Sequence, residues 1–447
     1  MRRLLLRAFI FSFVVVGVVQ AGDLFPEWRG IDGQGHADAK NLPVQFSESD
    51  AAWKHKVPGL GWSTPVVVDG KVWVTTGIDK EASEERKEVV KKTTTSSQPL
   101  IISSHVSLRV QCLDLETGKV LKDIELLTEE NPQFIHQVNS YATPTPIIDG
   151  DKLYCHYGPM GIACLDMKTE KVLWSNRTLR VKHENGPGSS PILWQDRLFI
   201  HCDGIDLQYI VALDKNTGEI LWKTTRSGEL REEPQLRKAY ATAIVVDVNG
   251  KDQIVSPAAD WIFGYDPETG EELWKTSYGV LGFSNAGRPV AAHGMVYINT
   301  GYLKSELLAL KIVEEDGKYE GKIQWRFNKQ VPNVSSVVVV GNEMYFASDN
   351  GIVTCLNAMT GESIWVHRMG SRYWASPLYA DGKIYFFERD AKVTVIEPGK
   401  EYKELGESTL SGTLFASPSV VDGHLLVRTD EALSKRNNKK YTWRNNI

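Results

Sequence analysis

One short phrase recurs eight times along the chain and constrains its fold more than any other feature. It joins a bulky residue, a small residue and Ser or Thr to Pro, with substitutions in some copies, and a β-branched run follows. Counted at the Pro position, the intervals between copies lie between 40 and 52 residues, except for a first interval of 79. A period of about 40–50 residues with strand-like content is typical of β-propeller blades. The copies are residues 62–65, 141–144, 188–191, 240–243, 286–289, 334–337, 374–377 and 415–418.

Residues 334–368 illustrate one repeat. Short strands are predicted at 336–340, 343–348, 352–357 and 362–368, separated by turns that contain Gly341, Gly351 and Gly361. Four antiparallel strands with tight turns between them make one propeller blade. The sequence therefore predicts an all-β chain, an eight-bladed β-propeller of four-stranded antiparallel blades.

A tryptophan recurs in the outermost predicted strand, a few residues after a turn that often reads Thr-Gly. Such a ring buries about 150–250 Å², and we expect it to pack between neighbouring blades in a structural docking role. The residues are Trp174, Trp222, Trp274, Trp325 and Trp365.

The pattern is broken in two places. Residues 79–107, rich in charge and then in Ser and Thr, are predicted to form a protruding, partly mobile loop inserted in the first blade. The last blade lacks an outer strand after Asp430, and residues 51–57 resemble that strand. Pairing of the two ends would close the ring and remove its free edges. The propeller is predicted to span residues 22–433, and residues 434–447 an irregular polar tail.

Residues 1–21 have the pattern of a secretory signal peptide, with Arg2, Arg3 and Arg7 before an apolar run and small residues at its end. The expected location is periplasmic or secreted, with no lipidation cysteine after the run and no transmembrane span in the mature chain. Without this segment the chain has 48 Lys and Arg against 56 Asp and Glu. This acidic balance argues against a nucleic-acid partner, and we expect a monomer.

The chain has five cysteines. Cys112, Cys164 and Cys355 share one repeat position, which favours small buried residues over mutual bonding. Cys155 and Cys164 flank a turn, and a cross-strand disulfide between them stays open as an alternative in an oxidising compartment.

Loops that lead into the inner strands should converge at one mouth of the central channel, and convergent polar groups in such a concavity suggest a binding site. Solvated loop surface is the equally weighted alternative. The candidates are His136, Asn139, His183, Glu184, Asn185, Arg231, Glu232, Asn285, Arg288, Asn333 and Arg372.

Arg288 replaces the Ser or Thr of the repeat and should face the channel. We expect it to pair with Glu184 or Glu232 in a structural salt bridge, or to hold an anionic ligand. Aromatic residues at Trp62, Tyr141, Tyr240, Trp374 and Phe415 are interpreted as a packing layer, with stacking on a flat cofactor as the alternative.

The segments 112–119, 212–219 with Trp222, and 265–271 with Trp274 resemble the repeat of pyrroloquinoline quinone (PQQ) type β-propellers. In that family the phrase is a tryptophan-docking motif. The resemblance covers nearly all of residues 50–430. The family includes quinoprotein dehydrogenases, BamB-like assembly lipoproteins and secreted propellers of unassigned activity. The chain differs from BamB in lacking a lipidation cysteine, and from quinoprotein alcohol dehydrogenases in lacking adjacent cysteines.

This resemblance implies a non-catalytic exported scaffold that binds protein or peptide partners in the periplasm or cell envelope, without catalytic residues, a metal or a cofactor. The alternative is a PQQ-dependent dehydrogenase that oxidises alcohols or sugars. It would need Ca²⁺ with oxygen ligands and a catalytic Asp. Glu184 with Asn185, or alternatively Asp260, could serve, although no spacing in the sequence identifies such a site. A third possibility is a propeller that binds a carbohydrate or a small anion.

Overall fold

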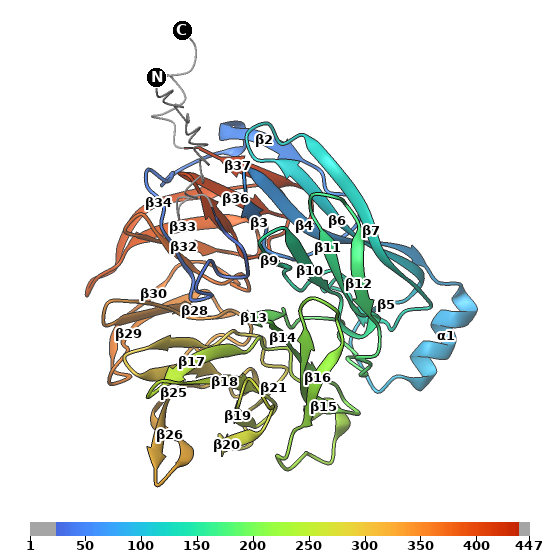
Figure 1. The fold of residues 1–447 in the computed structure, drawn as a ribbon. Coiled ribbons are helices and arrows are strands. Elements are labelled where there is room, and N and C mark those ends of the chain that lie inside the picture. Colours follow the sequence, from blue (N-terminus) through green and yellow to red (C-terminus); the bar gives the residue numbers. More distant parts are fainter. Residues whose placement is uncertain (1–23, 438–447) are drawn as a thin grey trace, which may run out of the picture.

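Eight small antiparallel sheets surround a central axis in the computed structural model, which describes residues 24–437 (Figure 1). Each sheet has four antiparallel strands, and one sheet carries a fifth, parallel strand. The predicted eight-bladed propeller is therefore confirmed. The expected signal peptide, residues 1–21, lies outside the described residues.

The blades are numbered along the chain, with the innermost strand first. Blade 1 consists of β3 (Val66–Val68), β4 (Lys71–Glu81), β6 (Ser103–Asp114) and β7 (Val120–Glu130), and blade 2 of β9 (Ile147–Asp149), β10 (Lys152–His156), β11 (Ile162–Asp166) and β12 (Val172–Asn176). Blade 3 consists of β13 (Ile192–Trp194), β14 (Arg197–Asp203), β15 (Gln208–Asp214) and β16 (Ile220–Thr225), and blade 4 of β17 (Ile244–Val248), β18 (Lys251–Pro257), β19 (Trp261–Tyr265) and β20 (Glu272–Ser277). Blade 5 consists of β22 (Val290–Ala292), β23 (Met295–Asn299), β25 (Leu307–Glu315) and β26 (Lys318–Phe327), and blade 6 of β27 (Val338–Val340), β28 (Glu343–Ala347), β29 (Ile352–Asn357) and β30 (Ser363–Arg368). Blade 7 consists of β31 (Leu378–Ala380), β32 (Lys383–Phe387), β33 (Lys392–Glu397) and β34 (Lys403–Thr409), and blade 8 of β35 (Ser419–Val421), β36 (His424–Arg428), β37 (Leu433–Arg436) and β2 (Ala51–His55). The other elements are β1 (His36–Ala37), β5 (Leu100–Ile101), β8 (Ile135–His136), β21 (Gly282–Phe283), β24 (Tyr302–Leu303), the helix α1 (Glu84–Thr93) and 3₁₀ turns at Glu48–Asp50, Gly158–Met160 and Pro234–Leu236.

The repeated Ser or Thr forms hydrogen bonds that run around the channel from blade to blade. The backbone N–H of Ser336 donates to Ser376 Oγ, and that of Ser376 to Ser417 Oγ, both at 3.0 Å. Thr64 Oγ1 closes the circle by donating to the carbonyl of Ser417 at 3.0 Å. These buried bonds satisfy N–H groups at the start of the inner strands, where the β ladder has not yet begun.

In blade 2 the repeat lies two residues later than the sequence suggested. The N–H of Thr64 donates to Thr145 Oγ1, and the N–H of Thr145 to Ser190 Oγ, both at 3.0 Å. The structural equivalent of Thr64-Pro65 is therefore Thr145-Pro146. The doubled Thr-Pro in this segment hid the register.

The recurring tryptophans join neighbouring blades. Trp222 Nε1 donates to the carbonyl of Pro267 in the next blade at 3.2 Å, and a Cβ added at Gly270 would lie 2.5 Å from the indole ring. Gly270 also has a φ of +73°, so this turn requires glycine for its backbone and for the close approach of the ring. The equivalent indole-to-carbonyl pairs are Trp53 with Leu115, Trp174 with Lys215, Trp325 with Ala358 and Trp365 with Gly399.

Trp274 and Lys122 vary this contact. Trp274 packs near Gly321 of blade 5, but its Nε1 donates to Gln253 Oε1 of its own blade at 2.7 Å. Lys122 occupies the tryptophan position of blade 1, and its Nζ donates to the carbonyl of Met167 in blade 2 at 2.9 Å.

The residue opposite the tryptophan position is small, and this explains the cysteine pattern. Cys164 and Cys355 face Trp174 and Trp365 directly across the ladder. All five cysteines are free and buried. Cys155 pairs with Ala163 in the register, so it points to the opposite face of the sheet from Cys164, which excludes the proposed disulfide.

Strand β2 pairs with β37 and closes blade 8, as predicted for residues 51–57 (Figure 1). The expected irregular tail is wrong at its start, because β37 extends to Arg436 between β36 and β2. Its side chains are polar but have partners: Lys435 Nζ bonds Glu116 at 2.9 Å, and Arg436 donates to the carbonyl of Ser47 at 2.8 Å.

The blade 1 insertion is more regular than the predicted loop. Strands β4 and β6 lengthen into a long hairpin that pairs as far as Glu81, and α1 lies between them, projecting beyond the ring (Figure 1). Ser83 caps the helix by accepting a hydrogen bond from the N–H of Arg86.

The segment between Phe25 and Ala37 lies inside the channel against the inner strands. Phe25 forms a bridge with Val67 of β3, and the carbonyl of Pro26 accepts from Ile148 of β9 at 2.9 Å. Elsewhere around the ring β1 pairs in parallel with β31 of blade 7. The chain therefore fills part of its own channel, and no repeat or motif in this segment predicted it.

We predict that Trp222→Ala lowers the free energy of unfolding by about 3–5 kcal/mol, because it removes the ring that joins blades 3 and 4. Leu221→Ala is the matched control, since Leu221 is 45% exposed and should change stability by about 0.5 kcal/mol or less. Urea denaturation followed by circular dichroism measures both. Equal losses in the two variants would show that the ring has no docking role.

A second prediction concerns Glu48, which ties the N-terminal segment to blade 8. Burial acts to raise its pKa, but hydrogen bonds from Lys54 and the Ser411 N–H and the charge of Arg436 outweigh this and lower the pKa to about 2. Since the folded pKa lies below the ordinary value of 4.5, the stabilisation is complete above about pH 4.5 and is lost as the pH falls toward 2.

Glu48→Gln should therefore reduce stability at pH 7, by about 1 kcal/mol or less because the carboxylate is partly exposed. The difference from the parent protein should shrink as the pH falls. Thermal unfolding midpoints from pH 7 to pH 3 measure it, with Glu401→Gln at an exposed position as control. A difference that stays constant with pH would contradict the assigned role.

Candidate functional site

Polar side chains from the loops of blades 3 and 4 meet the blade 1 insertion at the channel end where the inner strands begin. The Glu184 carboxylate, which is buried, accepts hydrogen bonds from Thr95 Oγ1 at 3.3 Å and from the Gln235 amide nitrogen. Thr95 follows α1, and β5 then pairs with β8, placing Leu100 opposite His136. The insertion therefore contacts the loops that lead into blades 2, 3 and 4.

Several predicted residues form one backbone-anchored group beside Glu184. Asn139 Nδ2 donates to the carbonyl of Asn185 at 2.7 Å, and the His136 N–H donates to the same carbonyl at 3.3 Å. His183 is buried, and its pKa falls to about 3 through burial and the nearby His156 and Lys238. The imidazole is therefore neutral at physiological pH, so it offers no positive charge to an anionic ligand.

Lys238 is a functional candidate that sequence reasoning missed. It is 3% exposed, and its Nζ donates to Gln235 Oε1. Burial lowers its pKa to about 8, opposed by the charge of Glu184. Among residues 24–437 it forms no salt bridge within 4 Å. Its position at the end of a charged loop gave no sign of burial.

The remaining predicted residues lie apart from this group. Arg231 pairs with both carboxylate oxygens of Asp260, and Asn285 is buried, with Nδ2 donating to the carbonyl of Ala258 at 2.9 Å. Asn333 donates to Asp349 at 2.8 Å on the far side of the ring. Glu232 and Arg372 are exposed.

Arg288 binds the segment within the channel and not the acids expected from the sequence. Its NH1 atom lies 2.9 Å from Glu27 Oε2 and donates to the carbonyl of Trp28 at 2.7 Å. A side chain at Gly33 would collide with the guanidinium. The expected pairing with Glu184 or Glu232 is wrong, because Glu27 lies closer along the channel.

The residues available for PQQ with Ca²⁺ do not fit that group. Both oxygens of Asp260 bond to Arg231, and Glu184 bonds to Thr95 and Gln235. In the part of the chain from 24 to 437, no three His, Cys, Asp or Glu side chains gather as a metal site would require. We therefore derive no chemical step through PQQ.

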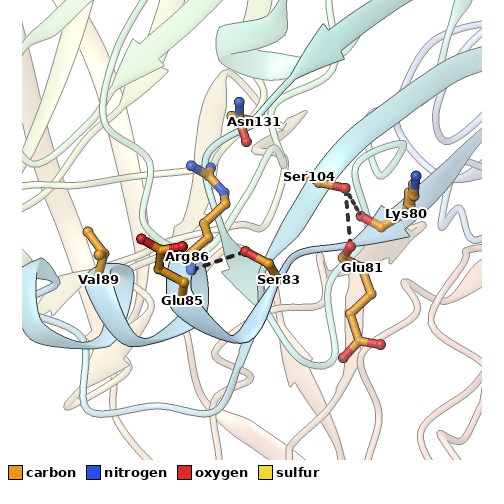
Figure 2. Close-up of a pocket in the computed structure, with 8 residues that line it drawn as sticks. All are labelled: Lys80, Glu81, Ser83, Glu85, Arg86, Val89, Ser104 and Asn131. Carbon is orange, nitrogen blue, oxygen red and sulfur yellow. Dashed lines mark hydrogen bonds between the residues drawn. The ribbon is translucent and has the colours of Figure 1, made fainter.

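A surface hollow of about 600 Å³ lies beside α1 (Figure 2). All its lining residues except Val89 carry polar or charged groups, and they come from β4, α1 and β6, together with Ser83 and Asn131. Ser104 Oγ donates to the carbonyls of Lys80 and Glu81 at 3.2 and 3.1 Å, which holds the strands together at its edge (Figure 2). This hollow is a second candidate surface, separate from the mouth.

Two comparisons with solved structures concern the fold. BamB from Moraxella catarrhalis superposes with a TM-score of 0.56 at 14% identity, over 87% of this chain and 99% of that one. A europium-containing methanol dehydrogenase superposes with a TM-score of 0.51 at 12% identity, over 91% and 90% of the two chains. At these identities the likeness shows the fold alone.

Within residues 24–437, none of the helices has the length and apolar character that a membrane span requires.

Sequence comparisons give the family. The chain is 31% identical over 115 residues to the outer membrane protein assembly factor BamB of Burkholderia pseudomallei, covering 25% of this chain and 30% of the relative. It is 23% identical over 207 residues to BamB of Yersinia pestis, covering 42% and 49%. The chain thus spans about a third to a half of these relatives. The family model described as outer membrane protein assembly factor BamB matches residues 45–224, 161–318 and 312–401, and the chain therefore belongs to this family of PQQ-repeat β-propellers.

Proposed function

We propose that this protein is a non-catalytic scaffold of the cell envelope that binds protein or peptide partners. The observation that carries this proposal is the occupation of the channel by the chain itself. Phe25 and Pro26 bond to β3 and β9, the inner strands of blades 1 and 2, and β1 pairs with β31 of blade 7. A channel filled in this way favours binding on the outer surfaces of the propeller over reaction inside it.

The relatives support the same function. Their name, outer membrane protein assembly factor, places them in the assembly of envelope proteins. We propose an exported location for this chain on that basis and on the signal-peptide pattern of residues 1–21. The partner we propose is a protein of the envelope.

Photo-crosslinking in the native envelope tests this function. A photoreactive residue at Leu121, Leu173 or Leu221 would sample outer strands of blades 1 to 3, where each side chain is at least 44% exposed. The same residue at exposed Val280, in blade 4, samples a separate loop. We expect discrete adducts with the same protein partner from at least one of these positions. A further position at exposed Glu431, beside the loop that leads into blade 8, samples the channel mouth. The absence of adducts from all of these positions would contradict a scaffold.

The alternative is tested on the purified full chain with PQQ and Ca²⁺ at micromolar concentrations. A scaffold should give no quinone absorbance change and no dye-linked oxidation of alcohols or sugars. A saturable absorbance change with dye reduction would overturn the proposal in favour of a dehydrogenase.

A further inference from the structure

The mouth has a second half, formed by blades 7, 8 and 1, in which aromatic rings take the place of the polar cluster. The ring centroid of Phe415 lies 4.6 Å from that of Trp62 and 5.0 Å from that of Trp374. Trp62 Nε1 donates to the carbonyl of Val138 at 3.1 Å and Trp374 Nε1 to Asp349 at 2.8 Å, so both indoles are held in place. Trp374 and Phe415 remain partly exposed.

Arg389 lies over this aromatic group without a counter-ion. Its guanidinium carbon is 5.2 Å from the ring centroids of both Trp374 and Phe415. The carboxylates next to it in sequence, Glu388 and Asp390, accept hydrogen bonds from Ser371. Within residues 24–437 the guanidinium has no hydrogen bond or ion pair. A cation–π contact orients the guanidinium but leaves its N–H donors free.

A second arginine lies on the neighbouring segment. The N–H of Arg389 donates to the carbonyl of Arg372 at 2.7 Å, and the Arg372 side chain is exposed and unpaired within the described residues. Each of the other arginine side chains among residues 24–437 forms an ion pair, as Arg109 does, or a hydrogen bond to a carbonyl, as Arg368 does. Two unpaired guanidiniums are therefore a local feature of a chain whose net charge is −5.

We propose that Trp374, Phe415, Arg372 and Arg389, supported from below by the buried Trp62, form an arginine–aromatic platform that binds an extended acidic peptide segment with an apolar side chain beside a carboxylate. Guanidinium groups bind carboxylates in bidentate fashion, and the ring faces offer apolar contact to the neighbouring side chain. The two arginines come from different loops, which suits carboxylates spaced along an extended chain. The inference rests on the proposed scaffold function and names the chemistry of its partner.

Fluorescence anisotropy with a labelled Gly-Glu-Phe-Glu-Gly peptide tests the platform on the full chain. We expect saturable binding that weakens with added salt, and a loss of about tenfold or more in Arg389→Gln and in Trp374→Ala. The Gly-Gln-Phe-Gln-Gly peptide should lose affinity similarly. Arg180→Gln is the matched control, because it removes the same charge at an exposed position on blade 2. Thermal unfolding of each variant verifies that it is folded.

Unchanged affinity in folded Arg389→Gln, or equal affinity for the Glu and Gln peptides, would overturn the platform. Binding of oligogalacturonate through Arg389 without peptide binding would replace a peptide ligand with an acidic sugar, and would also overturn it. Envelope adducts that persist in Arg389→Gln while the peptide does not bind would leave the scaffold function standing. PQQ-dependent activity would instead remove the scaffold function itself.

Discussion

The hydrogen bond from one inner strand to the hydroxyl of the next blade is the interaction on which the ring depends. The innermost strand of each blade has only three to five residues. The ladder within a blade does not join that strand to the neighbouring blade. The Ser or Thr before the strand receives the neighbour's N–H and fixes the spacing between blades. At the periphery a tryptophan on the outer strand packs against the next blade in six of the eight blades, whereas Lys122 takes this position in blade 1 and Gly406 in blade 7.

Arg288, which replaces the Ser or Thr of the repeat in blade 5, connects this ring to the chain segment that lies within the channel. Arg288 has no hydroxyl to accept from blade 4, although its own N–H still donates to Ser336 Oγ at 2.8 Å. Its buried guanidinium needs a carboxylate, because an unpaired charge in such a place is costly. Glu27 supplies it from the segment within the channel. The substitution that breaks the circle therefore anchors the segment that fills the channel.

Periodic features of this fold were predictable from sequence, whereas contacts without a period were not. The blades and the closing strand around Trp53 follow from recurring apolar and turn residues. Strand β37 carries Ser434, Lys435 and Arg436, and without alternating apolar residues it gave no strand signal, yet it is buried between two strands. Phe25 to Ala37 has no repeat, and its partners lie from about 40 to nearly 400 residues away. Arg288 pairs with Glu27 of the segment within the channel, an acid that spacing in the sequence could not identify.

The two halves of the mouth differ in how many of their polar side chains already have hydrogen-bond partners within the protein. On blades 3 and 4 the insertion supplies Thr95 to a loop acid, and Lys238 is buried beside it, so most polar groups there bond to one another. On blades 7 and 8 the loops are short, and Arg389 has ring faces as neighbours in place of acids. Polar groups already bonded within a protein gain little by exchanging those partners for a ligand's, whereas free guanidinium donors gain a full charge-assisted bond. Binding capacity at this mouth is therefore concentrated on the arginine–aromatic side, even though the other half contains more ionisable residues.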